Sequence, residues 1–405
     1  MPSNIEGKKN SISLKQLTSK CEKINFETIV STSINQMALS SGSLVKQWSE
    51  NNRNYFHYKT KNKVIPMIAY FSAYYKTKKV DYKGISIEQY YDAAHAFNIE
   101  DIENSTKQTI DYCEENFGDY AFDHVRIAEI PSHWSFGGFA HPGVISMVED
   151  RLFLADVRND ETFNLVAKRT IHEVAHQWFG NCITEYDWDD VWLSEGFATY
   201  FTLMFREHAY GRDDFVQGLK EAKKRVFDFY ETDKDASIVH NNLKDMKDVL
   251  TYSLQYQKGA WVLHMLRNYV GEDNFRNGIR NYYNKYYNSN TTTEEFKLEM
   301  ENASGKDLDK FFDQWLYKGG IIKLDISWSY NERLKQIEIK LDQVQDDGYL
   351  FEMPVELQLI YDNKSRIEKI FMDKKSKKYV ISSDYNPKEI KLDPHIKLLA
   401  KWNIN

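Results

Sequence analysis

The chain has 405 residues, 42% of them hydrophobic and 15% aromatic, which is enough for two or three domains with a sizeable core. Its 53 Lys and Arg residues against 60 Asp and Glu residues give a net charge of −7, which argues against a nucleic-acid partner. The cysteines Cys21, Cys113 and Cys182 lie far apart without a CxxC spacing, so neither a disulfide framework nor a structural zinc knuckle is expected.

The first ninety residues are expected to form a partial, β-rich segment. Residues 1–17 are polar and lack an apolar run, so no signal peptide is predicted. Short apolar runs at 56–60 and 64–75 are typical of strands, and the second, interrupted by Pro66, is too short to span a bilayer. We therefore expect a soluble chain without membrane contact. The missing signal peptide and disulfide pattern favour a cytoplasmic location.

Residues 91–320 are expected to form a mostly helical domain. A strand is predicted at 125–130, leading into Gly137. Helical spacing of apolar residues is found in several segments: 102–117, 162–179, 191–206, and a series from 257 to 318 that Gly319 and Gly320 end.

From Ile321 the apolar period changes to two. Apolar and polar residues alternate at 322–328, 337–341 and 355–359, which predicts a small C-terminal β-sandwich over residues 321–405. The expected fold class is therefore α+β, with a β-rich segment at 1–90, a helical domain at 91–320 and this β-sandwich.

An HExxH motif and a later glutamate predict a metal site. His172 and His176 are four residues apart, so on a helix both imidazoles lie on one face and can bind one cation. Glu195 follows after 195 − 176 − 1 = 18 residues and is the third ligand if its helix packs against the first. Two His and one Glu with an open fourth position are typical of catalytic zinc, so we expect one Zn2+ per chain, although cobalt and manganese also suit such sites.

Glu173 follows the first ligand and lies roughly 100° further around the helix, beside the metal position rather than facing it. A carboxylate there can take a proton from the attacking water and pass it to a leaving amine. The isolated His133, His240 and His264 are expected to have core or surface roles.

Three sequence stretches resemble one enzyme family. HEVAHQWFGN, WLSEGFA and YQKG, in this order, are similar to those of the gluzincin zinc aminopeptidases, the family of aminopeptidase N and the leukotriene hydrolases. The resemblance covers roughly residues 90 to 320. It implies a thermolysin-like zinc peptidase domain and a peptide substrate, with His172, His176 and Glu195 as zinc ligands, Glu173 as general base, and Tyr256 as the donor that stabilises the transition state. Members usually carry a longer β-domain, so we expect either a minimal variant or a fragment of a larger polypeptide.

One family motif is altered. The Gly-x-Met-Glu-Asn segment, whose Glu binds the free α-amine of the substrate, corresponds here to Gly137, Gly138, Phe139, Ala140 and His141. We expect these residues to line the substrate site, but the Ala140 methyl cannot pair with an ammonium. His141 is either a polar substrate contact or a turn residue before Pro142.

Three functions stay open. The resemblance favours zinc-dependent, aminopeptidase-like hydrolysis of peptide bonds. Ala140 favours an endopeptidase or a leader-peptide-removing protease instead. The third alternative is a peptide-binding domain without catalysis, and the complete set of predicted catalytic residues argues against it.

Overall fold

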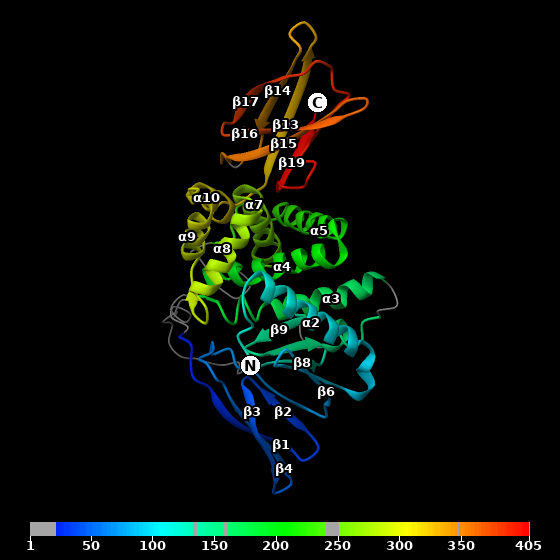
Figure 1. The fold of residues 1–405 in the computed structure, drawn as a ribbon, viewed down its shortest axis with the longest axis vertical. Coiled ribbons are helices and arrows are strands. Elements are labelled where there is room, and N and C mark those ends of the chain that lie inside the picture. The colour runs from blue at the N-terminus through cyan, green and yellow to red at the C-terminus, as the bar shows by residue number, and fades with distance from the viewer. Residues whose placement is uncertain (1–21, 133–135, 157–159, 240–250, 347, 405) are drawn as a thin grey trace.

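The computed structural model describes residues 22–132, 136–156, 160–239, 251–346 and 348–404. Strands of the N-terminal region occupy one end of an elongated molecule, helices lie in the middle, and the C-terminal strands form the opposite end (Figure 1). No helix in these ranges is both long and apolar enough to cross a membrane.

The N-terminal strands form two small sheets. One has the order β1-β4-β3, and β2 pairs with β5 in the other; the bounds are β1 Glu27–Ser33, β2 Met37–Ser40, β3 Ser43–Glu50, β4 Arg53–Lys59 and β5 Tyr70–Ala73. Alternate residues Phe56 and Tyr58 of β4 point inward and are buried against Ala38. The stretch expected as a strand at 64–75 is regular only in β5, since Pro66 cannot donate a ladder hydrogen bond.

A five-stranded sheet supports the site. Its order is β6-β7-β8-β10-β9, with bounds β6 Lys76–Tyr82, β7 Ile85–Tyr91, β8 His124–Ile130, β9 Gly138–His141 and β10 Val144–Val148. The predicted strand at 125–130 is confirmed as β8, whose residues are all buried because it lies between the parallel strands β7 and β10. β9 is the antiparallel edge strand. β6 precedes residue 90 and β7 spans it, yet both belong to this sheet. The division at 90 stays a prediction.

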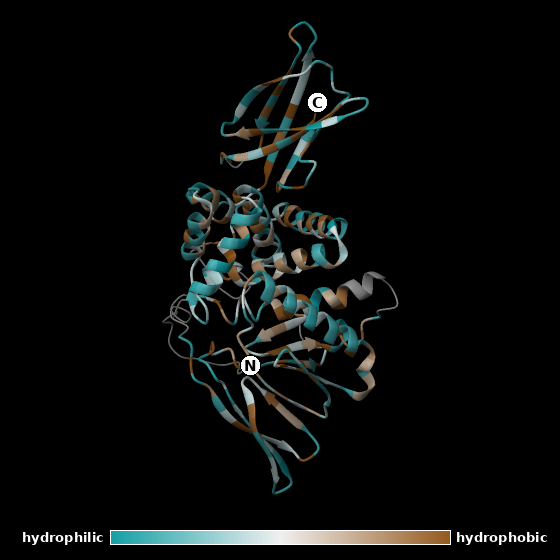
Figure 2. Ribbon diagram, viewed as in Figure 1, coloured by the Kyte–Doolittle hydropathy of each residue, from teal (hydrophilic) through white to brown (hydrophobic). Residues whose placement is uncertain are grey.

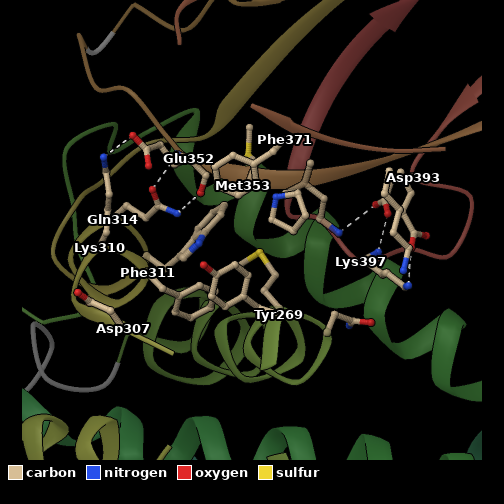
Figure 3. Close-up of a pocket in the computed structure, with 17 residues that line it drawn as sticks. Tyr269, Asp307, Lys310, Phe311, Gln314, Glu352, Met353, Phe371, Asp393 and Lys397 are labelled. Carbon is tan, nitrogen blue, oxygen red and sulfur yellow. Dashed lines mark hydrogen bonds and ion pairs between the residues drawn. The ribbon is translucent and has the colours of Figure 1, made fainter. Parts of the chain in front are cut away.

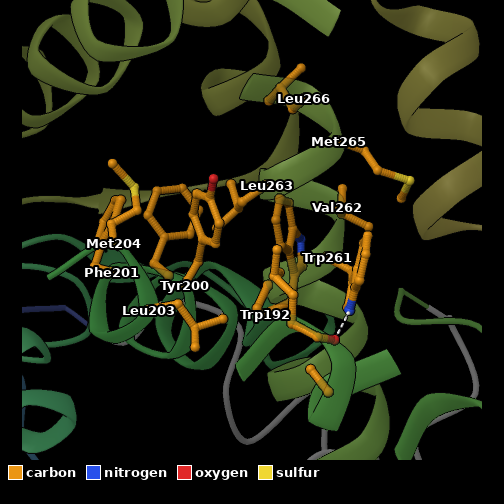
Figure 4. Close-up of a cluster of buried hydrophobic side chains, with 14 of the residues drawn as sticks. Trp192, Tyr200, Phe201, Leu203, Met204, Trp261, Val262, Leu263, Met265 and Leu266 are labelled. Atoms are coloured by element: carbon orange, nitrogen blue, oxygen red, sulfur yellow. Dashed lines mark hydrogen bonds between the residues drawn. The ribbon is translucent and has the colours of Figure 1, made fainter. Parts of the chain in front are cut away.

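Helices pack above this sheet. Their bounds are α2 Ile99–Asn116, α3 Asp160–Ala175, α4 Trp192–Tyr210, α5 Arg212–Tyr230, α7 Gly259–Val270, α8 Glu272–Lys285, α9 Thr293–Ser304 and α10 Asp309–Leu316. Short turns of 3-10 helix lie at η1 Ala93–Asn98, η2 Glu149–Arg151 and η3 Trp188–Asp190, and a π-helical turn, η4, spans Tyr252–Lys258. Trp192 and Tyr200 of α4 and Trp261 of α7 are buried in the core of these helices (Figure 4).

At the C-terminal ends of α3 and α4, the predicted and observed helix boundaries differ by four residues. α3 ends at Ala175 rather than at residue 179, because Gln177 and Trp178 donate to carbonyls only three residues back, at 3.0 Å each. α4 continues past residue 206 to Tyr210, where Gly211 adopts a φ of 94° that favours glycine and ends the helix.

The C-terminal strands form the predicted sandwich. One sheet has the order β17-β14-β13-β19 and the other β16-β15-β18. The bounds are β13 Ile322–Asn331, β14 Gln336–Gln343, β15 Met353–Ile360, β16 Ser365–Met372, β17 Ser376–Ser382, β18 Glu389–Leu392 and β19 Ala400–Ile404. Leu324 and Ile339 are buried while their neighbours in the chain are more exposed, so hydrophobic and hydrophilic residues alternate along the strands (Figure 2).

The sandwich is joined to the helices by polar contacts around a small pocket of about 140 Å³ (Figure 3). The Gln314 side chain of α10 donates to the Glu352 carbonyl at 2.7 Å and accepts from the Glu352 amide at 2.9 Å. Since Glu352 directly precedes β15, this reciprocal pair of hydrogen bonds orients β15 relative to α10.

Candidate metal and peptide site

α3 and α4 bring the three predicted metal ligands together. The ligand atoms of His172, His176 and Glu195 all lie within 4.8 Å of one another. Glu195 Oε2 is 3.2 Å from His176 Nε2 and 3.5 Å from His172 Nε2, and the two Nε2 atoms are 3.2 Å apart. His176 directly follows the last residue of α3, and its amide still donates to the His172 carbonyl at 3.3 Å. The four-residue spacing therefore places both imidazoles on the face that meets the first turn of α4. The arrangement can hold one metal ion.

The hydrogen bonds of His176 fit this role. Its Nδ1 lies 3.1 Å from the Phe179 carbonyl and 3.1 Å from Ser194 Oγ. A ring nitrogen that donates to a carbonyl carries the proton, so Nε2 of the neutral ring is left with a lone pair directed at Glu195. Glu195 Oε2 is buried, and the Nε2 atoms of His172 and His176 are polar groups that face it. Lone pairs converging on one point are stable only when a positive charge lies between them.

The carboxylate favours positive charge at this point. Although burial opposes it, Glu195 raises the pKa of His176 to about 9. In turn, and again against burial, the His176 and His172 imidazoles hold the pKa of Glu195 below its usual range. A bound cation would supply the same positive charge without a proton.

Glu173 lies beside the three-residue cluster and against β9. Burial raises its pKa, and the nearby Glu195 charge adds to the effect. A Cβ atom added to Gly138 would lie only 2.8 Å from Glu173 Oε1 and 2.6 Å from Met147 Sδ. Only glycine at this position therefore lets the edge strand approach the predicted general base so closely.

Tyr256 reaches the same region from η4. Its ring stacks on His172 with centroids 6.1 Å apart and an interplanar angle of 15°. Burial and Glu195 raise its pKa above the usual range, so the phenol keeps its proton and can donate a hydrogen bond. The sequence pattern predicted a helix after Tyr256 but not the π-helical turn that carries it, and such turns are frequent at functional sites.

These side chains open into a cleft of about 890 Å³. Of the altered family motif, Gly137, Gly138, Phe139 and Ala140 line this cleft. The ring of His141 turns elsewhere: its Nδ1 lies 3.1 Å from the Met67 carbonyl, and the ring packs 4.8 Å from that of Phe139. The structure thus places His141 in contact with the N-terminal region.

Several cleft residues were missed by the sequence analysis. Glu185, in the two-residue strand β11 Thr184–Glu185 that pairs with β12 Asn290–Thr291, lines the cleft, and burial raises its pKa to about 7. Four basic residues also line it, namely Arg151, Lys168, Arg169 and Arg225. Isolated charges carry no motif, so no sequence signal distinguished them from surface residues.

The remaining candidates have structural roles or lie outside the described residues. His264 is buried, and its Nε2 lies 2.8 Å from the Ile396 carbonyl, which agrees with the expected core role. Cys113 and Cys182 are buried free thiols. His133, His240 and Cys21 lie outside the residues that the structure describes.

Comparison with known proteins decides the family. The model of the peptidase family M1 domain matches residues 102–315, which is more than half of the chain. This chain belongs to peptidase family M1. The resemblance predicted from the HExxH, WLSEGFA and YQKG stretches is therefore confirmed.

Relatives of this M1 chain are aminopeptidases. Probable aminopeptidase 2 of Sulfurisphaera tokodaii is 32% identical over 53% of this chain and 28% of its own length. Aminopeptidase A of Gloydius brevicauda is 28% identical over 72% of this chain and 32% of its own length. The M1 chain thus spans about a third of the length of these curated relatives.

A solved structure shows the same fold. The crystal structure of Legionella pneumophila aminopeptidase A in complex with aspartic acid matches 98% of this M1 chain and 47% of its own chain, with a TM-score of 0.83 and 18% sequence identity. The predicted α+β fold class is confirmed.

Proposed function

We propose that this chain is a zinc-dependent peptidase that hydrolyses peptide bonds. The convergence of His172, His176 and Glu195 in a cleft that also contains Glu173 and Tyr256 carries the proposal. Membership of peptidase family M1 supports it. When bound by the first three residues, zinc would act as a Lewis acid toward the peptide carbonyl and would make water more acidic.

The other side chains divide the remaining chemistry. Glu173, whose pKa is raised by burial, is suited to accept a proton from water and to return it to the leaving amine. Tyr256 keeps its proton and is suited to donate a hydrogen bond to the oxyanion as the carbonyl becomes tetrahedral. β9 lies at the edge of its sheet, so its free backbone groups can pair with an extended peptide.

Aminopeptidase-like action is the first candidate, because the relatives are aminopeptidases. Endopeptidase or leader-removing action is the second, because Ala140 lines the cleft where the family motif carries its amine-binding Glu. Both use the same bond-breaking groups. They differ in whether a free α-amine is required.

The test combines metal content with peptide cleavage. The purified chain should contain one zinc per molecule by elemental analysis and should cleave members of a peptide library offered with free and with acetylated N-termini. Release of only N-terminal residues from free peptides supports an aminopeptidase, and equal internal cleavage of acetylated peptides supports an endopeptidase. A zinc-loaded chain that cleaves neither set, while Glu173→Gln binds peptides equally well, would contradict catalysis and leave a peptide-binding role.

A further inference from the structure

The two ends of the cleft can be distinguished by the antiparallel helices α3 and α4 that line it. His176 lies beside Glu195 in the first turn of α4, whereas Lys168 interacts with Arg206 near the end of α4. α3 and α4 therefore run in opposite directions across the cleft. Lys168 is eight residues before His176, about 12 Å along the helix axis.

The edge strand β9 runs along the cleft from the Lys168 end towards the His176 end. A Cβ atom on Gly137 would lie 3.6 Å from Arg151 Cδ and 4.0 Å from Arg169 Nε, at the Lys168 end. The Ala140 carbonyl instead accepts a hydrogen bond of 3.3 Å from Asn181, just after α3. Glu185 follows in the same segment and interacts electrostatically with His176 and Glu195. Ala140 and Glu185 thus lie at one end of the cleft.

The two ends carry opposite charge. The four basic residues that line the described part of the cleft, Arg151, Lys168, Arg169 and Arg225, all lie at the Lys168 end. Glu221 is the acidic residue that lines the described cleft at this end, while Asp214 also acts on Lys168 and Asp150 acts on Arg169. Since Asp214 is paired with Arg206, the basic side chains outnumber the remaining carboxylates and this end stays positive. A cationic group of a substrate would be repelled there.

Glu185 is the cleft carboxylate without a role. The described residues that line the cleft include four carboxylates, Glu173, Glu185, Glu195 and Glu221. The first and third have proposed catalytic and metal-binding roles, and the last faces the basic end. Glu185 Oε2 is buried and has no hydrogen-bond partner among the described residues. A buried carboxylate oxygen without a donor is costly, and a cationic ligand removes that cost.

We propose that Glu185 accepts a positively charged group of the substrate at the Ala140 end of the cleft. The substrate class is then peptides with an ammonium on that side, supplied either by the free α-amine or by a basic side chain. The assignment rests on the proposed function only in taking a peptide as the occupant. It explains how the cleft can select a charged peptide end although Ala140 carries no charge.

The test measures binding without turnover. Zinc-loaded Glu173→Gln serves as the background, and three probes are titrated by calorimetry: trialanine, N-acetyl-trialanine and N-acetyl-lysyl-dialanine. Adding Glu185→Gln should lower the affinity for the two cationic probes, trialanine and N-acetyl-lysyl-dialanine, about ten- to a hundredfold, as expected for a lost hydrogen bond between charged groups. The affinity for N-acetyl-trialanine should not change. If the affinity falls for trialanine alone, the α-amine supplies the positive charge that Glu185 binds. If it falls for the lysyl probe alone, the lysine side chain supplies that charge.

Glu221→Gln is the matched control, because it removes the same charge from the opposite end of the cleft. It should change the affinity of the cationic probes by no more than about twofold. Adding Ala140→Glu to the Glu185→Gln chain should restore the affinity for the probe that was lost, since it returns a carboxylate to the same end.

Three results would overturn the assignment. The cationic probes could bind no more tightly than N-acetyl-trialanine, Glu185→Gln could weaken all three probes equally, or Glu185→Gln could lose its zinc, which would show that the carboxylate serves the metal site. A wild-type chain without hydrolytic activity would contradict the proposed function alone, because none of these titrations depends on turnover.

Discussion

Replacing Gly138 by alanine tests whether close contact with β9 positions Glu173. The added Cβ would lie 2.8 Å from Glu173 Oε1, and ordinary contacts of this kind begin near 3.4 Å, so the carboxylate must retreat by about 3.4 − 2.8 = 0.6 Å. General-base catalysis contributes roughly 10²–10⁴-fold, and a displacement of about 1 Å costs on the order of 10²-fold. We therefore expect Gly138→Ala to lower kcat by about ten- to a hundredfold with zinc content unchanged.

Gly137→Ala is the control for this experiment. It adds the same methyl group one residue earlier, where the nearest atom, Arg151 Cδ, is 3.6 Å away. Both variants change the backbone entropy of the unfolded chain in the same way. kcat should be measured on a peptide that the wild type cleaves, alongside thermal unfolding. If kcat of Gly138→Ala stays within about twofold of that of Gly137→Ala, the contact does not position the base.

Three further predictions concern the metal, the phenol and pH. His172→Ala and Glu195→Ala should each lose zinc and activity together, because two ligands hold the ion poorly; elemental analysis showing full zinc in either variant would contradict the ligand assignment. Tyr256→Phe should keep zinc but lower kcat by roughly 10²–10³-fold, whereas wild-type turnover would exclude an oxyanion role. Burial lowers the pKa of His264 to about 3, so between about pH 6.5 and pH 3 only the unfolded chain protonates this side chain. The free energy of unfolding therefore decreases as the pH is lowered through this range. Denaturant unfolding should show that His264→Gln removes about 1.4 kcal/mol per pH unit of this slope between pH 6 and 4; an unchanged slope would contradict the pKa.

The parts of the fold that were predicted correctly follow from local patterns of apolar residues. The alternation after Ile321 predicted the C-terminal strands, because the period of two is set by the geometry of a single strand. The apolar run in β8 likewise marked a strand buried on both faces. The end of α3 was misplaced, since the turn after Ala175 depends on hydrogen bonds that apolar spacing does not encode.

For the candidate site, too, some features could be predicted from the sequence and others could not. The four-residue spacing of His172 and His176 places their imidazoles together on any helix, and the resemblance around Glu195 and Tyr256 indicated the remaining partners. What the sequence alone determined is therefore the set of candidate metal ligands, because the ligand chemistry depends on residue type and the pairing of the two histidines on spacing within one element.

The tertiary structure alone decided the surroundings of that cluster. Gly138 lies against Glu173, and Glu185 faces the cleft opposite the basic residues around Lys168, only because β9 packs against α3 while β11 and α5 pack against α4. His141 points to Met67 instead of the cleft for the same reason. Contacts between segments distant in the chain are set by packing, and single charged or small residues carry no periodic signal from which that packing could be read.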